Sequence, residues 1–145
     1  MANPGADHAM WIVVGVDGSE ESARARDWAL AEARLRGTGC RLVHAWEYGI
    51  AASAPFVGGL EQLAEAAEAL FDEEMARARV SGVAVEGHLQ FGPAAKILID
   101  ASEDACMLVV GSRGRGGLAG ALLGSVSSAC VHHAHCPVVV VRPPG

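Results

Sequence analysis

Four short apolar runs and one segment of alternating apolar residues set the possible folds of this chain. The runs cover residues 11–17, 41–46, 106–110 and 137–141. The alternating segment covers 83–90, and helix-like stretches separate these five segments. Runs this short favour buried strands, because a membrane-spanning helix needs about 18–20 apolar residues. Strands that alternate with helices are joined by right-handed crossovers and form a parallel sheet with helices on both faces. The pattern predicts a single doubly wound α/β domain with a five-stranded parallel sheet.

Helix start and stop signals fill the intervals between these segments. Ser19 is a good N-cap for the first helix, and Gly37 is placed to end it. Further helices are expected over 60–80, around Ile97 and over 125–133. In the first helix, the side chains whose spacing points to the core are Ala25, Trp28, Ala29 and Ala33.

The length of 145 residues suits one compact domain. We expect a loose leader over residues 1–9 and a folded domain over 10–145, because the first residues lack the basic and apolar regions of a secretory signal. The four cysteines are then expected to be reduced thiols in the cytoplasm. Binding to a membrane or to a nucleic acid is not expected: no apolar run is long enough for a membrane span, and the net charge is −6.

The charge is unevenly distributed along the chain. Residues 105–145 contain Arg113, Arg115 and Arg142 and no acidic residue, which gives a net charge of +3. The preceding part holds the other 8 basic residues and all 17 acidic ones, a net charge of −9. The C-terminal part is therefore where a small anion is expected to bind.

A glycine-rich segment with the spacing Gly111-x2-Gly114-x9-Gly124-Ser125 follows the fourth strand. Glycine lets backbone N–H groups approach a ligand closely, and a helix that starts near Ser125 adds its positive N-terminal dipole. In a doubly wound sheet, ligands bind beside the carboxyl ends of the strands. The segment predicts a phosphate-binding loop, and the alternative is a flexible connection without a ligand.

Two better-known phosphate loops do not fit this segment. The loop of P-loop NTPases needs Gly-Lys followed by Ser or Thr, but Lys96 is the sole lysine and lies between Ala95 and Ile97. The motif from Gly114 to Ala119 matches G-x-G-x-x-A of dinucleotide-binding folds. That fingerprint also needs an acidic residue about 20 positions later, and the sequence has none there.

The glycine spacing, together with residues 13–19, 42–45, Gly92-Pro93 and 136–142, resembles the universal stress protein family in its ATP-binding form. The resemblance extends over nearly the whole chain. It implies strand order 3-2-1-4-5, so that the first and fourth strands are neighbours. It also implies that this chain binds ATP and acts in regulation or stress adaptation.

The resemblance also assigns residues to the nucleotide. Asp17 is implied to lie near the phosphates or to bind Mg²⁺, which prefers hard oxygen ligands; alternatively, Asp17 only caps the first helix. Ala45 is implied to contact adenine through its backbone. The remaining residues implied to line the nucleotide are Gly15, Val16, Val110, Gly111, Arg113, Gly114, Gly124, Ser125 and Val126.

Other functions remain as alternatives. A nucleotide-free interaction module is one, since the resemblance implies a homodimer formed through the apolar strand 138–141. A slow ATPase is another, although no nucleophile–base pair is recognisable, and His44 is expected to be a hydrogen-bonded core residue. A zinc site is the third; its candidate ligands are Cys130, His132, His133, His135 and Cys136, which are hard to close into one tetrahedron.

Overall fold

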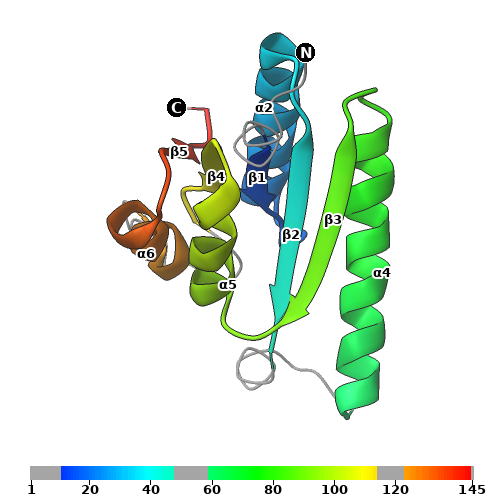
Figure 1. Ribbon diagram of the computed structural model, residues 1–145. Coiled ribbons are helices and arrows are strands. Elements are labelled where there is room, and N and C mark those ends of the chain that lie inside the picture. Colours follow the sequence, from blue (N-terminus) through cyan, green and yellow to red (C-terminus); the bar gives the residue numbers. More distant parts are fainter. Residues whose placement is uncertain (1–10, 48–58, 114–122, 145) are drawn as a thin grey trace.

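The computed structural model describes residues 11–47, 59–113 and 123–144 (Figure 1). The expected leader over 1–9, nearly all of the connection before residue 59, and Gly114 lie outside the described residues. In chain order the described elements are β1 (Ile12–Gly15), α2 (Glu20–Arg36), β2 (Cys40–Trp46), α4 (Leu60–Arg79), β3 (Val85–Phe91), α5 (Ala94–Ala101), the 3₁₀ helix η2 (Ser102–Asp104), β4 (Met107–Gly111), α6 (Ser125–His133) and β5 (Val138–Val141). No helix within these residues is long and apolar enough to cross a membrane.

The strands form one parallel sheet in the order β3-β2-β1-β4-β5. This confirms the predicted α/β class and strand order. After β1 the chain adds β2 and β3 on one side, and it later adds β4 and β5 on the other. The strand order therefore reverses between β1 and β4, where their carboxyl ends leave space for a ligand in folds of this type.

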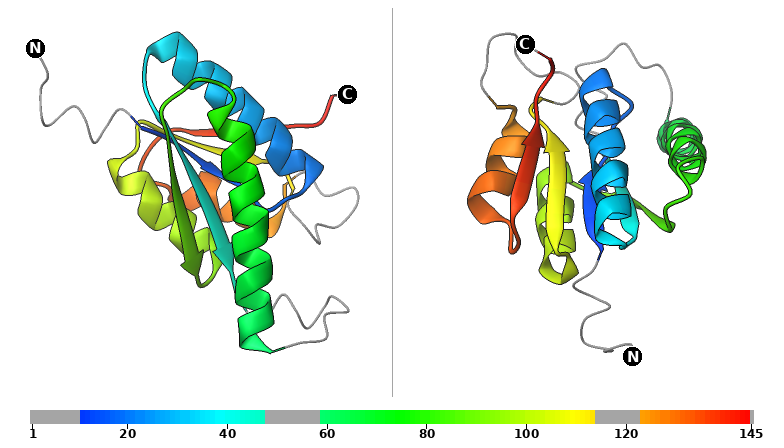
Figure 2. Two further views of the ribbon diagram at one scale, coloured as in Figure 1. Left: turned by 90° about the vertical axis from the view of Figure 1, so that its right-hand side faces the viewer. Right: turned by 90° about the horizontal axis from the view of Figure 1, so that it is seen from above.

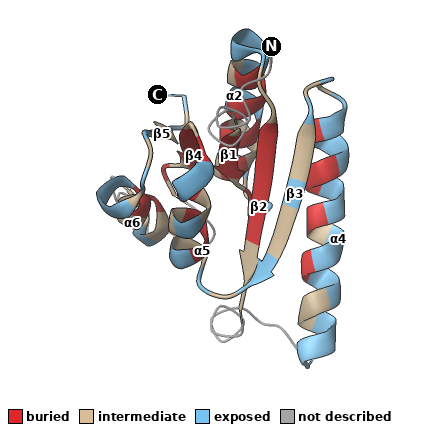
Figure 3. Cartoon of the chain, viewed as in Figure 1, coloured by how far each residue is buried: buried red, intermediate tan, exposed pale blue. Residues whose placement is uncertain are grey.

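Helices cover both faces of the sheet (Figure 2). One hydrophobic cluster joins side chains of α2 and α4 to one face, with Ala29 and Phe71 among its members. The other cluster joins α5 and α6 to the opposite face and includes Leu98 and Cys130. Central strands are mostly buried and the edge strands β3 and β5 are only half-buried (Figure 3), which explains why the central strands have near-continuous apolar sequences.

Local signals set the ends of α2 as the sequence predicts. The Ser19 side chain accepts a hydrogen bond from the Ser22 amide at 3.1 Å and caps the helix N-terminus. Gly37 ends the helix in the left-handed conformation, with φ of 68°, which a residue with a side chain adopts at a cost. Both signals are local, so they can be recognised without knowing the fold.

The expected core stripe of α2 is wrong at Trp28. This side chain is 37% exposed, whereas the polar residues Ser22 and Arg26 on the same helix are buried. The buried arc of the helix centres on positions 22, 26, 29 and 33, and Trp28 lies well outside that arc. Arg26 tolerates burial because a carboxylate on α4 neutralises it, and a hydrophobic pattern gives no sign of such a pair.

The third strand begins two residues later and ends one residue later than the alternation predicts, at Val85 and Phe91 instead of 83 and 90. Its register with β2 continues until Trp46 pairs with Phe91. Hydrogen bonding to β2 therefore sets the end of this strand. A half-exposed edge strand carries a weak hydrophobic pattern, so its boundaries are poorly determined by the sequence.

Candidate functional site

The turn after β1 is shaped by the side chain of Asp17. Its Oδ1 accepts a hydrogen bond from the Ser19 amide at 2.9 Å, and the Asp17 amide donates to Ser22 Oγ at 3.2 Å. Gly18 between them has a φ of 82°. Ser19, not Asp17, supplies the side-chain cap of α2, so Asp17 fixes the turn that delivers the cap.

His44 holds the backbone just before this turn. Its Nδ1 lies 2.7 Å from the carbonyl oxygen of Val16, and the Val16 amide donates to the Val43 carbonyl at 2.9 Å. A carbonyl can only accept, so His44 Nδ1 carries the proton and donates it. The imidazole is buried and stacks on Phe71. These contacts confirm the expectation that His44 is a hydrogen-bonded core residue.

At the end of β4, the chain lies directly against the first turn of α2. A Cβ atom on Gly111 would lie 3.0 Å from the Glu21 carbonyl oxygen, which is a tight contact that glycine avoids. Beyond it, Ser112 Oγ lies 3.5 Å from Glu21 Oε2, and Arg113 Nη2 lies 3.8 Å from Glu21 Oε1. The first turn of α2, which follows β1, therefore contacts the segment at the carboxyl end of β4.

The N-terminus of α6 is tied to the same segment. The Gly124 amide donates to the Ser112 carbonyl at 2.7 Å, and Ser127 Oγ donates to that carbonyl at 2.8 Å. Gly124 has no side chain to cap the helix, and the first turn contains no acidic residue. Ser125 at the first helical position is exposed. The amide groups of this turn carry a partial positive charge.

The described residues assigned to a nucleotide come from four places along the carboxyl edge of the sheet. Three follow or end β1, one lies in β2, three end or follow β4, and three begin α6. The side chains of Ala45, Val110 and Val126 all belong to the cluster on the α5–α6 face. Val110 is buried in this cluster, and Ala45 and Val126 are half-buried against it. The described members of the set are Gly15, Val16, Asp17, Ala45, Val110, Gly111, Arg113, Gly124, Ser125 and Val126.

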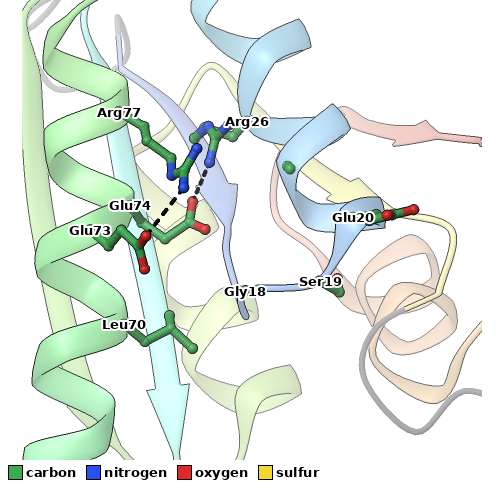
Figure 4. A pocket seen from close by; sticks show the side chains of 9 residues that line it. Gly18, Ser19, Glu20, Arg26, Leu70, Glu73, Glu74 and Arg77 are labelled. Carbon is green, nitrogen blue, oxygen red and sulfur yellow. Dashed lines mark hydrogen bonds and ion pairs between the residues drawn. The ribbon is translucent and has the colours of Figure 1, made fainter.

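A pocket of about 320 Å³ lies between α2 and α4 (Figure 4), and its lining residues come from the turn before α2 and from these two helices. Arg26 Nη1 lies 2.7 Å from Glu74 Oε2 there, and Arg77 pairs with Glu73 at 3.2 Å. Burial by itself lowers the pKa of Arg26, but the hydrogen bond and negative charge of Glu74 raise that pKa overall. Arg26, Glu73, Glu74 and Arg77 of the pocket are thus already paired with each other.

No pattern in the sequence predicts this pocket. Arg26 and Glu74 are 48 positions apart and lie on two different helices. A periodicity analysis places each charged residue on a solvent face, so it cannot find the pair. Gly18 and Ser19 line the pocket and directly follow Asp17 in the chain. The turn before α2 therefore borders both the pocket and the end of β1.

The candidate zinc ligands near the C-terminus lie in different surroundings. Cys130 is fully buried, whereas His132 Nδ1 is bonded to the Ser128 carbonyl and His135 lies 3.8 Å from Glu103. Across 11–47, 59–113 and 123–144, no three His, Cys, Asp or Glu side chains form a group that could hold a metal ion.

Comparison with known sequences gives consistent matches over the chain. A model described as the universal stress protein family matches residues 10–142. The universal stress protein Rv2005c of Mycobacterium tuberculosis is 35% identical over 150 residues, covering 98% of this chain and 50% of that protein. Rv2623 of the same organism, also a universal stress protein, is 36% identical over 142 residues, covering 92% and 48%. The chain spans about half the length of the curated relatives it matches.

Solved structures are similar in fold. A universal stress protein in complex with cAMP is 27% identical, with a TM-score of 0.70 and coverage of 94% of this chain and 98% of that one. The Archaeoglobus fulgidus universal stress protein in complex with dAMP is 29% identical, with a TM-score of 0.66 and coverage of 90% and 96%. The protein MJ0577 has a TM-score of 0.79 and coverage of 96% and 99%, and at 23% identity it is a likeness of fold alone.

Proposed function

This chain belongs to the universal stress protein family, and we propose that it binds an adenine nucleotide at the carboxyl edge of its sheet. The observation that carries the proposal is the N-terminus of α6, which has neither a side-chain cap nor an acidic residue and lies beside the switch point between β1 and β4. Such a terminus attracts phosphate. Two members of the family with similar structures were solved in complex with cAMP and dAMP.

The phosphates bind at the first turn of α6 and at the guanidinium of Arg113. Amides of Ser125 and Val126 donate to phosphate oxygens, and the exposed Ser125 hydroxyl adds a further donor. Ribose and adenine lie along the backbones of Val110, Gly15 and Ala45. Gly114, outside the described residues, completes the phosphate loop in this proposal.

The specific ligand we propose is ATP with Mg²⁺. Asp17 supplies a carboxylate at the turn after β1, and Mg²⁺ is commonly held by one or two carboxylates together with phosphate oxygens and water. When bound, the metal ion neutralises part of the triphosphate charge. Asp17 also keeps its contact to the Ser19 amide, so its orientation is set before any ligand arrives.

We also propose a homodimer formed through β5. The four valines of this edge strand, Val138–Val141, are all only half-buried, and an uncovered apolar edge strand readily pairs with another strand. Light scattering at micromolar concentration tests this proposal. A dimer that becomes a monomer when Val140 is replaced by lysine supports it, and a wild-type monomer contradicts it.

The cysteines support a cytoplasmic location as part of the proposal. All four are free thiols. Burial raises the pKa of Cys40 to about 12 and that of Cys130 to about 11, so both stay protonated at neutral pH. Reducing conditions preserve thiols of this kind.

The test of nucleotide binding is thermal unfolding with ATP–Mg²⁺, AMP and cAMP from micromolar to millimolar concentration. A ligand that binds only the folded state raises the unfolding temperature as its concentration increases. Mass spectrometry of the supernatant from heat-denatured, freshly purified protein then identifies any nucleotide carried through purification. If no nucleotide shifts the transition at millimolar concentration, the proposed function is wrong.

A further inference from the structure

The Glu21 side chain lies between two arginines at the switch point. Its Oε1 is 3.8 Å from Arg24 Nη1 on the same helix and 3.8 Å from Arg113 Nη2 beyond β4. Its Oε2 is 3.5 Å from Ser112 Oγ. The side chain is 19% exposed, whereas that of the preceding residue, Glu20, is 92% exposed and points away from α4 (Figure 4). Glu21 is thus directed towards the end of β4.

We infer that Glu21 competes with the nucleotide phosphate for Arg113 and thereby sets the affinity and charge selectivity of the site. This inference rests on the proposed function. A carboxylate and a phosphate present similar oxygen acceptors to a guanidinium. Glu21 Oε1 lies 3.8 Å from Arg113 Nη2, so a carboxylate already faces this guanidinium. A bound phosphate therefore has to replace a carboxylate that is already in place.

The backbone around Glu21 packs closely against the end of β4. The first turn of α2 packs against Gly111 so closely that a Cβ there would lie 3.0 Å from the Glu21 carbonyl. Glu21 therefore yields Arg113 by turning its side chain, with the helix in place. Because the carboxylate is mostly shielded from solvent, its attraction to Arg113 is screened less than that of a surface pair.

Arg24 provides a second cation for Glu21 when Arg113 binds a phosphate. It already lies near the same oxygen of Glu21 as Arg113 does. When a phosphate binds Arg113, Glu21 keeps Arg24, so the exchange leaves no carboxylate without a cation. A ligand succeeds only if it attracts Arg113 more strongly than a carboxylate does. This favours phosphate groups, with their greater charge, over the carboxylates of common metabolites.

The experiment is isothermal titration of the full chain with AMP and with ATP–Mg²⁺. Glu21→Gln removes the competing charge with little change in shape, so affinity should rise about three- to tenfold. Glu20→Gln removes the same charge from the adjacent, exposed residue and should change affinity less than about twofold. Glu32→Gln, at the Arg36 pair near the other end of α2, should leave affinity unchanged.

A double-mutant cycle separates competition for Arg113 from simple repulsion of phosphate. Arg113→Gln should weaken binding. Glu21→Gln should add little or nothing in that background, because Arg113, the arginine that Glu21 would release to the phosphate, is gone. An equal gain in both backgrounds would show repulsion and overturn the inference. Melting curves of each ligand-free variant establish that it is folded.

The result for the wild type distinguishes the two proposals. If neither wild type nor Glu21→Gln binds AMP or ATP–Mg²⁺, the proposed function itself fails. If wild type binds and Glu21→Gln binds equally or more weakly, nucleotide binding stands and the role of Glu21 is wrong. Tighter binding by Glu21→Gln, lost with Arg113→Gln, supports both.

Discussion

The N-termini of α2 and α6 lie at the same edge of the sheet and differ in every feature that matters to an anion. The α2 helix begins with a serine cap and continues with Glu20 and Glu21. The α6 helix begins with Gly124 and continues with Ser125 and Val126. Ser112 contacts both, through its side chain to Glu21 and through its carbonyl to the Gly124 amide. Both N-termini thus lie beside Ser112. The first turn of α2 has a side-chain cap and two acidic residues, whereas that of α6 has neither.

The comparison teaches that a helix N-terminus attracts a ligand only where the chain leaves its amides to the ligand. A side-chain cap and acidic residues stabilise a helix by about 0.5–2 and 0.3–1 kcal/mol respectively. They also occupy the positions that a phosphate needs. On this view α2 serves stability and α6 serves binding, and substitutions at the two helices should affect different measurements.

The first prediction concerns the ion pair that anchors α2 to α4, and it has the largest expected effect on stability. Glu74→Gln removes the charge that anchors Arg26 of α2 to α4. It should lower the free energy of unfolding by about 3 kcal/mol, because the buried guanidinium keeps only the exposed carboxylate of Asp27. Urea denaturation measures this loss. Glu73→Gln, which affects the exposed pair with Arg77, should cost less than about 1 kcal/mol; equal costs would contradict the anchoring role.

The next effect concerns the turn that leads into α2. His44→Phe keeps an aromatic ring against Phe71 but removes the donor to the Val16 carbonyl. A buried carbonyl without a partner should lower the free energy of unfolding by about 2 kcal/mol. Chemical denaturation measures this value. A variant as stable as wild type would mean that the bond does not hold the turn.

The third prediction concerns a variant in which the first turn of α6 carries an acidic residue, as that of α2 does. Ser125→Glu places an acidic residue in the first turn of α6, which should leave the free protein as stable or slightly more stable. Nucleotide affinity should fall about tenfold or more, since the carboxylate repels phosphate. Calorimetric titration measures the affinity. Val131→Glu adds the same charge at an exposed position later in α6 and should retain most of the nucleotide affinity. Similar losses of affinity in both variants would mean that the first turn of α6 has no special role in binding.

The smallest expected effect compares the two caps directly. Ser19→Ala removes the acceptor of the Ser22 amide and should lower the free energy of unfolding by about 1 kcal/mol. Gly124→Ala removes no side-chain cap and should change stability by less than about 0.5 kcal/mol. Thermal unfolding of the two variants in parallel decides the point. If both variants lose the same free energy of unfolding, the side chain of Ser19 does not stabilise α2 as a cap.

Local features of the fold could be predicted because their signals lie within a few residues. The α6 helix begins at Ser125 and ends at His133 as the sequence indicates. Gly37 ends α2 where a left-handed residue is needed. The strand order came from family resemblance, since an alternation of strands and helices does not fix it. Trp28 was misplaced because helical spacing alone does not say where the centre of the buried arc lies.

The candidate site divides in the same way. The glycine spacing and the absence of acidic residues after Asp104 are visible in the sequence, and they point to an anion site after the fourth strand. The contact between Glu21 and Arg113 joins residues in different elements. No periodicity or motif connects them, so only packing of α2 against Gly111 reveals that a carboxylate faces the arginine.

The sequence by itself determined the alternation of strands and helices, the helix caps and the charge of the C-terminal part, because each depends on neighbouring residues. The tertiary structure alone decided that Arg26 is buried with Glu74, that His44 holds Val16, and that Glu21 faces Arg113. These pairs join residues distant in the chain, and their distances follow from strand order and close packing. Capping and charge are local properties, whereas the identity of a side chain's partner is a property of the whole fold.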